Sequence, residues 1–432
     1  MQTPELYKIY QQFSSIQTDT RKIKEGDLFF ALKGPNFNGN QFAKQALVLG
    51  AAYAIVDEEI NEPGDRIIKV NDVLKSLQAL ALHHRRQFIL PGAEKQIPFI
   101  AVTGSNGKTT SKELIHAVLS STFKTYTTEG NLNNHIGIPL TILKIKKDAA
   151  IAIIEMGANH QKEIEGYCIY TMPTHGVITN CGKAHLEGFG GEEGIRKGKG
   201  ELFDYLRLHS GTAFIMDDYD YLKEMSAGIK EVITYGTHNA AVTGIVKNSS
   251  ALLEITISTG EDLDSIKTNL VGDYNLPNVL LAVAIGKYFK VPTEKIKMAL
   301  ENYIPSNSRS QLIEKDSNKI ILDAYNANPT SMKAAIENFA KMQGDDKVLL
   351  LGGMKELGTE SLTEHQMLLD LIEKYDWKNV VLVGNEFENT TNNYLQFENA
   401  DQAGEWYRQQ DFANTLILIK GSRSTQMEKV LE

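Results

Sequence analysis

The stretch Ala-Val-Thr-Gly-Ser-Asn-Gly-Lys-Thr-Thr at residues 101–110 limits what this chain can fold into more than any other part of it. An apolar run at residues 97–102 predicts a buried strand before it, and apolar residues at helical spacing follow in residues 111–121. A glycine-rich turn between a strand and a helix gathers backbone N–H groups and the positive end of the helix dipole around an anion. Lys108 can then meet terminal phosphates, and the Thr109 hydroxyl can bind Mg²⁺. The segment predicts an ATP site on an α/β sheet.

Composition sets the class of protein and its setting. The chain has 432 residues, of which 42% are hydrophobic and 23% charged, enough to bury the cores of about three domains. Its formal net charge of −9 argues against a nucleic-acid partner, because such binding needs clustered Lys and Arg. Residues 1–5 lack a signal-peptide pattern and no apolar run approaches a membrane span, so we expect a cytoplasmic protein. Its two cysteines, Cys168 and Cys181, lack metal-ligand spacing and favour packing roles.

Strand-like and helix-like runs alternate along most of the chain and predict three α/β domains. Residues 1–92 form a small N-terminal domain, residues 93–304 a central ATP-binding domain with a mostly parallel sheet, and residues 305–432 a Rossmann-like domain without a Gly-x-Gly-x-x-Gly fingerprint. Short alternating runs within residues 212–270 predict antiparallel strands added to the central sheet.

Polar residues follow several of the predicted parallel strands, where ligands of such sheets bind. Glu155 ends an apolar strand and can hold a second Mg²⁺, although an ordinary strand-end Glu would look the same. His185 follows a third strand, and a lone His is more often structural than a ligand. The loop at residues 130–139 is rich in Asn, which suits either peptide-substrate binding or a cluster of Asx turns. Lys199 lies on what composition alone describes as a basic helix face.

The motifs at these positions resemble those of the Mur ligase family. The phosphate loop has its form Thr-Gly-Ser-Asn-Gly-Lys-Thr-Thr, in which Val102 stands where the general P-loop pattern has another glycine. Residues 130–139 match Gly-Asn-x-Asn-Asn-x-Ile-Gly-x-Pro, and residues 180–187 match Asn-x-Gly-x-Ala-His-Leu-Glu. Residues 323–329, 352–358 and 420–423 match Asp-x-Tyr-Asn-Ala-Asn-Pro, Gly-Asp-Met-x-Glu-Leu-Gly and Lys-Gly-Ser-Arg of one branch. The resemblance covers nearly the whole chain.

The resemblance implies a role for each matching residue. Lys108, His185 and Lys199 are the implied catalytic residues, and Lys199 matches the lysine that carries a carbamate in the family. Two Mg²⁺ ions would be held by Thr109, Glu155, His185 and carbamylated Lys199. The ATP-binding residues would be Gly104, Ser105, Asn106, Gly107, Lys108, Thr109, Thr110, Asn275, Asn278, Arg309, Asp323 and Asn326. The substrate-binding residues would be Thr20, Arg21, Asn131, Asn133, Asn134, Lys420 and Ser422.

Four positions depart from the family pattern. Asn38 and Asn40 flank Gly39 where the family has Asp-Gly-His, Tyr274 stands where it has His, and Gly353 stands where it has Asp. The roles of the replaced side chains therefore cannot be carried over to this chain.

The branch that the C-terminal motifs resemble adds D-alanyl-D-alanine to UDP-N-acetylmuramoyl-tripeptide through an acyl phosphate made with ATP. We expect that activity in a monomer, with these small molecules as the partners and closure of the three domains around them. A ligase of the MurE or folylpolyglutamate synthase type would share the phosphate loop but lack the motif at residues 325–329. A nucleotide-gated binding protein would use the loop as a switch without Glu155, His185 and Lys199. The sequence leaves the third residue of the tripeptide open.

Overall fold

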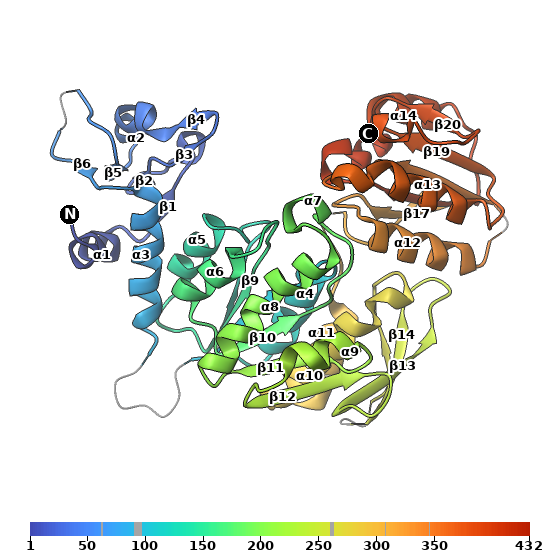
Figure 1. The fold of residues 1–432 in the computed structure, drawn as a ribbon, viewed down its shortest axis with the longest axis horizontal. Helices are drawn as coiled ribbons and strands as arrows, with labels where there is room; N and C mark the ends of the chain where they lie inside the picture. The colour runs from blue at the N-terminus through green and yellow to red at the C-terminus, as the bar shows by residue number, and fades with distance from the viewer. Residues whose placement is uncertain (62–63, 90–96, 260–262, 307, 345) are drawn as a thin grey trace. The chain divides into compact units, whose positions relative to one another are not determined.

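The computed structural model describes residues 1–61, 64–89, 97–259, 263–306, 308–344 and 346–432 (Figure 1). Two compact units make up the chain. One comprises Met1–Ala101, Lys124–Gly157 and Glu163–His175, and the other comprises Val102–Phe123, Ala158–Lys162 and Gly176–Glu432. The predicted domain limit between residues 92 and 93 lies outside the described residues, and the limit at residue 304 stays a prediction. No helix within the described ranges has the length and apolar content that a bilayer crossing requires.

A four-stranded parallel sheet in the order β1-β2-β5-β6 opens the first unit. Its strands are β1 Ile16–Gln17, β2 Leu28–Phe30, β5 Tyr53–Val56 and β6 Ile67–Lys69, with a small hairpin of β3 Lys33–Gly34 and β4 Phe37–Asn38 beside α2 Ala43–Val48. Alanines at residues 43, 46, 51 and 54 pack with Phe29 and Val56. Small side chains let α2 lie close to the sheet, so this domain needs little core volume.

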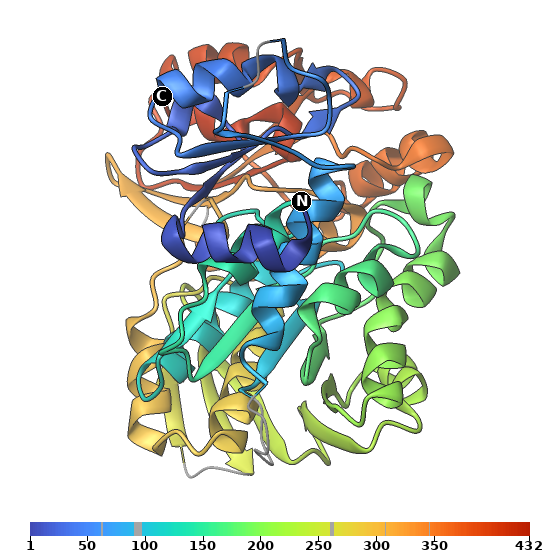
Figure 2. The same ribbon diagram turned by 90° about the vertical axis from the view of Figure 1, so that its left-hand side faces the viewer.

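The helix α3 Val73–Arg86 joins the first sheet to the rest of its unit. Asp72 caps it by accepting a hydrogen bond from the Lys75 N–H at 2.8 Å. The helix α1 Thr3–Gln12 packs across α3, as Figures 1 and 2 show. At its other end the buried Arg85 guanidinium lies 3.7 Å from the Phe99 ring centroid and donates to the Thr171 carbonyl. This end of α3 is thereby fixed to the start of β7.

A nine-stranded sheet in the order β15-β14-β13-β12-β11-β10-β7-β9-β8 occupies the middle of the chain. Its strands are β7 Phe99–Thr103, β8 Thr125–Thr127, β9 Ile151–Glu155, β10 His175–Ile178, β11 Thr212–Met216, β12 Glu231–Gly236, β13 Val242–Asn248, β14 Glu254–Thr259 and β15 Leu263–Lys267. Its helices are α4 Lys108–Ser120, α5 Gly137–Lys144, α6 Glu163–Thr171, α7 Leu186–Phe189, α8 Glu192–Leu208, α9 Asp220–Ser226, α10 Leu276–Tyr288 and α11 Thr293–Asn302. All residues of β7, β9, β10 and β11 are buried, which explains their uninterrupted apolar runs.

The prediction of antiparallel strands over residues 212–270 is only partly correct. β13 pairs antiparallel with β14, and β14 with β15. In contrast, β11 and β12 pair parallel, and so do β12 and β13. The helix α9 connects β11 to β12 as a crossover, and an alternating sequence pattern does not show the direction of the neighbouring strand.

A six-stranded sheet in the order β16-β17-β21-β18-β19-β20 forms the C-terminal part. Its strands are β16 Gln311–Lys315, β17 Asn318–Asp323, β18 Lys347–Gly352, β19 Asn379–Val383, β20 Leu395–Phe397 and β21 Leu416–Lys420, and its helices are α12 Pro329–Lys341, α13 Ser361–Ile372 and α14 Ala400–Arg408. Every pair is parallel except β16 with β17. The predicted α/β class is confirmed, including the mostly parallel sheets and the Rossmann-like C-terminal part.

Candidate active site

The phosphate loop connects β7 to α4 in the second unit, and its two glycines cannot be replaced. Gly104 has φ +143°, and a Cβ there would lie 1.9 Å from Thr179 Oγ1. Gly107 has φ +78°, and a Cβ there would lie 2.6 Å from Asn278 Oδ1. The loop therefore presents bare backbone at the start of a 13-residue helix. Such a cradle fits the phosphates of a nucleotide.

Residues after β10 hold the loop in this shape. The Ser105 N–H donates to the Asn180 carbonyl at 2.9 Å, and its hydroxyl donates to the Gly182 carbonyl at 2.6 Å. The Asn106 N–H donates to Asn180 Oδ1 at 3.1 Å, and Thr179 Oγ1 donates to the Asn106 carbonyl at 2.6 Å. Thr179 and Asn180 were not among the predicted site residues. Their position directly after a strand of the same sheet is the signal that could have found them.

Lys108 and two asparagines complete the nucleotide side. Lys108 Nζ donates to the Gly104 carbonyl at 2.7 Å and to the Ser105 carbonyl at 3.3 Å, so the ammonium lies over the loop. Asn278 Nδ2 donates to Asn275 Oδ1 at 2.8 Å, while Asn278 Oδ1 accepts from the Ser111 hydroxyl at 3.0 Å. Asn275 thus holds the side chain of Asn278, which in turn contacts α4 through Ser111. Thr109 is buried at the first turn of α4, next to Thr110.

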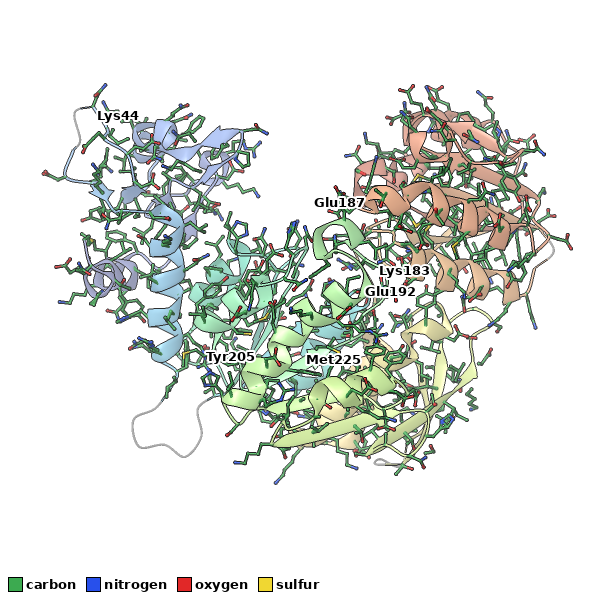
Figure 3. The ribbon with its side chains drawn as sticks, in the orientation of Figure 1. Lys44, Lys183, Glu187, Glu192, Tyr205 and Met225 are labelled. Carbon is green, nitrogen blue, oxygen red and sulfur yellow. The ribbon has the colours of Figure 1, made fainter. Side chains whose placement is uncertain are left out.

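Two segments of the C-terminal part contact the phosphate loop region. Asn328 caps α12 through its Oδ1, and its Nδ2 donates to Asn106 Oδ1 at 2.7 Å. The Lys183 N–H donates to Thr330 Oγ1 at 3.0 Å, and Lys183 Nζ pairs with Glu364 at 2.7 Å. Lys183 also lies 3.8 Å from Glu192, which Figure 3 labels beside it. These contacts border a cavity of about 510 Å³.

The strand ends β17 and β21 bring four predicted site residues together. Lys420, 2% exposed, forms an ion pair with Asp323 and donates to the Asn326 carbonyl at 3.3 Å. Asp323 Oδ1 also accepts from the Ser310 N–H at 3.1 Å. The Arg309 guanidinium lies 3.5 Å from the ring centroid of Tyr325. A charged cluster of this kind at strand ends suits binding of a nucleotide or a zwitterion.

The predicted residue Ser422 and Tyr274, one of the departures from the family pattern, are engaged in structural contacts. Ser422 Oγ donates to the Gly353 carbonyl at 2.6 Å. The Tyr274 hydroxyl lies 3.1 Å from Ser310 Oγ, and burial, then the charge of Asp323, raises the pKa of this phenol. Tyr274 thus supplies an aromatic ring whose hydroxyl group remains protonated.

His185 and Lys199 lie at two helices that follow β10. His185 has φ +53° directly before α7, and its Nδ1 contacts the carboxylate of Glu356 from the C-terminal part. That contact outweighs burial and lowers the pKa of Glu356. Lys199 is 1% exposed on α8, and its Nζ lies 5.1 Å from the Phe189 ring centroid. Both predicted residues are therefore held in place by packing or charge.

In the first unit, the predicted site residues Glu155 and Asn133 form a hydrogen bond that the sequence did not indicate. Glu155 is buried at the end of β9, and its Oε1 accepts from Asn133 Nδ2 at 2.8 Å. Asn134 Oδ1 accepts from the Gly137 N–H at 2.9 Å at the start of α5. The exposed Asn131 accepts through its carbonyl from the Asn133 N–H at 2.8 Å. Asn134 thus has a structural role, while Asn133 fixes the carboxylate.

Thr20 and Arg21 form the 3₁₀ turn Thr20–Lys22 on the surface of the same unit. The Arg21 guanidinium lies 2.8 Å from Asp19, and its hydrogen bonds lower the pKa of Asp19 to about 2. The Arg21 side chain is 88% exposed, so it can reach an anionic ligand.

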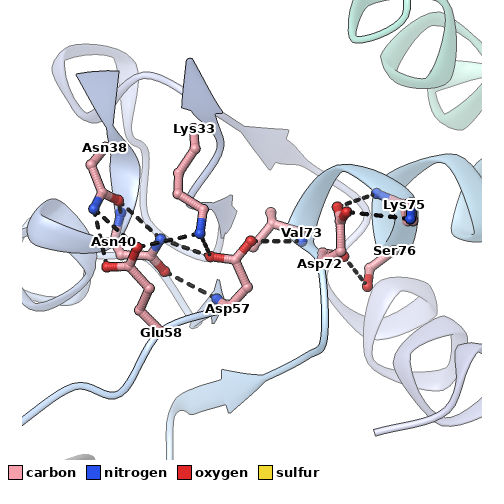
Figure 4. A network of polar contacts seen from close by, with 9 residues as sticks. All are labelled: Lys33, Asn38, Asn40, Asp57, Glu58, Asp72, Val73, Lys75 and Ser76. Atoms are coloured by element: carbon pink, nitrogen blue, oxygen red, sulfur yellow. Dashed lines mark hydrogen bonds and ion pairs between the residues drawn. The ribbon is translucent and has the colours of Figure 1, made fainter. Parts of the chain in front are cut away.

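Asn38 and Asn40, two of the departures, belong to a polar network at the hairpin (Figure 4). Asn38 Oδ1 accepts from the Asn40 N–H at 3.0 Å, and Asn38 Nδ2 donates to Glu58 at 3.0 Å. Asn40 Nδ2 donates to Asp57 at 2.9 Å, and Lys33 pairs with the same carboxylate at 2.9 Å. The two amides thus keep the turn in place through hydrogen bonds to each other and to the carboxylates of Glu58 and Asp57.

We expect Asp57 to stabilise this network only above acidic pH. Burial alone would raise the pKa of Asp57, but hydrogen bonds from Lys33, Asn40 and the Val73 N–H outweigh it and lower the pKa. A carboxyl with a lowered pKa adds stability above its unfolded value of about 3.9, and that stability is lost as the pH falls through the folded pKa. Asp57→Asn should lower the local free energy of unfolding by about 1–3 kcal/mol at pH 7, and by less at a pH below the folded pKa.

Amide hydrogen exchange of β5 measures this effect. Glu59→Ala is the matched control, since Glu59 is 84% exposed in its pair with Lys69 and should contribute less than about 1 kcal/mol. An effect of Asp57→Asn that stays the same from pH 7 down to the acid unfolding of the protein would contradict the assignment.

Comparison with known proteins identifies the family. A nucleotide cradle on a parallel sheet, joined to a Rossmann-like part, defines an α/β nucleotide-binding enzyme. Three family models match: the Mur ligase family catalytic domain at residues 12–85, the Mur ligase middle domain at 102–286, and the Mur ligase glutamate ligase domain at 308–423. The chain belongs to the Mur ligase family. The predicted family and the class of ATP-dependent amide ligase are confirmed.

Three relatives show how much of the chain is shared. The UDP-N-acetylmuramoyl-tripeptide–D-alanyl-D-alanine ligase of Bacillus subtilis is 34% identical, over 96% of this chain and 92% of its own. The crystal structure of MurF from Acinetobacter baumannii aligns with a TM-score of 0.86 at 32% identity, over 97% of this chain and 92% of that one. MurF from Thermotoga maritima in complex with ADP aligns with a TM-score of 0.85 at 25% identity, over 96% of each chain.

Proposed function

We propose that this chain joins D-alanyl-D-alanine to UDP-N-acetylmuramoyl-tripeptide with ATP, in bacterial peptidoglycan synthesis. The hydrogen bond from Asn328 to Asn106 carries the proposal. It connects the phosphate loop, shared by ATP-dependent ligases, to the motif at residues 325–329 that the rival ligases lack. The relatives named above with this activity or structure match the chain over nearly its full length.

In the proposed reaction, a tripeptide carboxylate oxygen attacks the γ-phosphorus of ATP and ADP leaves. The amine of the dipeptide then attacks the acyl carbon, phosphate leaves, and one proton is released. Gly104 and Gly107 give the phosphates room, and Lys108 offsets their charge. Arg309, Asp323, Asn326 and Lys420 are proposed for the nucleotide and amine, and Thr20 and Arg21 for the diphosphate of the UDP-sugar.

Mg²⁺ fits the residues that the chain offers. Among the described residues, no three His, Cys, Asp or Glu side chains lie close enough to form a metal centre. Mg²⁺ in nucleotide sites is held by phosphates, waters and one or two protein oxygens, and we assign the Thr109 hydroxyl to one ion and the Glu155 carboxylate to a second. Bound there, it would neutralise developing phosphate charge. We assign further metal contacts to His185 and to Lys199 as a carbamate, because a carbamate provides the oxygen ligand that an ammonium lacks.

The substrates are tested by omission. Purified protein with ATP and Mg²⁺ should release ADP in step with a pentapeptide product, detected by mass, only when tripeptide substrate and dipeptide are both present. Release that neither substrate stimulates would refute the substrate assignment. We place the reaction in the cytoplasm, where ATP is made, and propose a monomer; scattering should show one chain per particle and compaction with both ligands.

Lys199→Ala separates the ligase from a nucleotide-gated binding protein. It should abolish turnover while leaving ATP binding intact, because Lys199 lies on α8 and outside the phosphate loop. Lys197→Ala is the matched control, since Lys197 is exposed two residues earlier on the same helix and should retain full activity. Unchanged turnover in Lys199→Ala would contradict the assigned role.

A further inference from the structure

The carboxylate of Glu386 fills space that side chains of two other residues would otherwise use. Gly353 follows β18, and a Cβ there would lie 2.3 Å from Glu386 Oε2 and 3.0 Å from Glu386 Cβ. Gly384 follows β19 with φ +108°, and a Cβ there would lie 2.5 Å from the same oxygen. Glu386 belongs to the turn Asn385–Phe387, and its side chain is only 13% exposed. The glycine at residue 353 therefore makes room for a carboxylate that comes from the next strand.

Glu386 forms an ion pair with Lys355, which lies two residues after Gly353. The neighbouring Met354 N–H donates to His365 Nε2 at 3.0 Å, while His365 Nδ1 lies 2.7 Å from the Ser361 carbonyl. His365 is fully buried, and burial lowers the pKa of its imidazole. A neutral ring that donates through Nδ1 and accepts through Nε2 satisfies both contacts. Two side chains thus fix the start of the segment at residues 353–358, which we call the clasp.

The clasp reaches the proposed catalytic residue His185 and the helix α7 that follows it. Glu356 has φ +63°, a strained value for a non-glycine residue, and its carboxylate contacts His185 Nδ1. Its carbonyl accepts from the Glu187 N–H at 3.4 Å. A Cβ added at Gly358 would lie 3.2 Å from Glu187 Cβ, so the end of the clasp also packs against α7. The strained backbone at Glu356 is therefore held by the contacts of residues 353–355 before it and by the packing of Gly358 against α7 after it.

We propose that Glu386 is a positioning residue that supplies, from the end of β19, the negative charge that residue 353 does not carry. By holding Lys355 it keeps the clasp in the conformation in which Glu356 fixes the His185 ring. The Glu356 carboxylate against His185 Nδ1 restrains the ring and leaves Nε2 for the reacting groups. The role of Glu386 in turnover rests on the proposed function. That a carboxylate at residue 386 stands in for one at residue 353 does not rest on it.

A double-mutant cycle tests this exchange. Gly353→Asp should push Glu386 away from Lys355 and place two carboxylates together. Glu386→Ala should leave Lys355 without its partner. Each single variant should lower kcat by about 10-fold or more with little change in the KM for ATP, as for partners that orient a reacting residue. In Gly353→Asp/Glu386→Ala the new Asp should replace the lost carboxylate and restore most of kcat.

Glu388→Ala is the control, because Glu388 is exposed in the same segment and should behave as wild type. Glu386→Gln keeps the shape without the charge, and it should resemble Glu386→Ala. Both tryptophans, Trp377 and Trp406, lie in the C-terminal part, so the Tm from their fluorescence follows the same cycle without substrate. A double variant no better than the worse single variant in Tm and kcat would overturn the proposal. A coupled Tm with a wild-type protein that makes no product would refute only the proposed function.

Discussion

Lys420→Met should lower the free energy of unfolding of the C-terminal part by about 3–5 kcal/mol, because it leaves the mostly buried carboxylate of Asp323 without its positively charged partner. The Lys420 side chain is 2% exposed and that of Asp323 is 16% exposed. Methionine keeps the apolar stem, so the loss reports the charge and not a cavity. Urea unfolding followed by fluorescence of Trp377 and Trp406 measures it.

Removing the charge of Asp323 as well shows whether the unpaired charge causes the loss of stability. Removing both charges in Lys420→Met/Asp323→Asn should recover most of the stability, since the cost lies in the unpaired buried ion. Lys333→Ala is the control from the same part of the chain, where Lys333 is 65% exposed and 3.9 Å from Glu337. It should cost less than about 0.5 kcal/mol. A double variant as unstable as Lys420→Met would show that the pair acts through shape rather than charge.

The sequence predicted the central strand, loop and helix because glycine positions and apolar runs depend on local chemistry. It also placed Glu155, Asp323 and Lys420 at the ends of β9, β17 and β21, since apolar runs show where a buried strand stops. Pairing was harder to predict. The runs of β11 and β12 were predicted to form antiparallel strands, yet the short α9 makes them parallel neighbours, and the edge strands β16 and β20 carried too few apolar residues to be recognised.

Partners that are distant in the sequence account for what remained unpredicted at the site. Asn180 and Asn328 hold Asn106 from 74 and 222 positions away, and nothing local in either segment indicates that contact. Gly353 illustrates the same limit. In the sequence, Gly353 shows only that the Asp of the family pattern is missing. The fold brings the carboxylate of Glu386, from the turn after β19, into that space. Such a replacement of one carboxylate by another can be recognised only when the pairing of β18 with β19 is known.

Lys108→Ala should reduce kcat by about 10²–10³, as removal of one preorganised charge donor does in other enzymes. Lys108 Nζ now lies on the carbonyls of Gly104 and Ser105, which hold the ammonium at the loop where a terminal phosphate would bind. One charge pair at 4 Å is worth about 1 kcal/mol in water and about 4 kcal/mol at an effective dielectric of 20. The loss should therefore be largest when both substrates are bound and water is excluded.

Steady-state kinetics and calorimetric ATP binding separate the two contributions of Lys108. Because the charge that it offsets grows during phosphoryl transfer, kcat should fall more than ATP affinity. Lys108→Arg should restore binding better than turnover, since the planar guanidinium cannot take the place of a compact ammonium. Thermal unfolding should change little, because Asn180 and Thr179 hold the loop independently of Lys108. A kcat that stays within about threefold of wild type would remove Lys108 from the catalytic residues and leave the glycine backbone as the principal phosphate ligand.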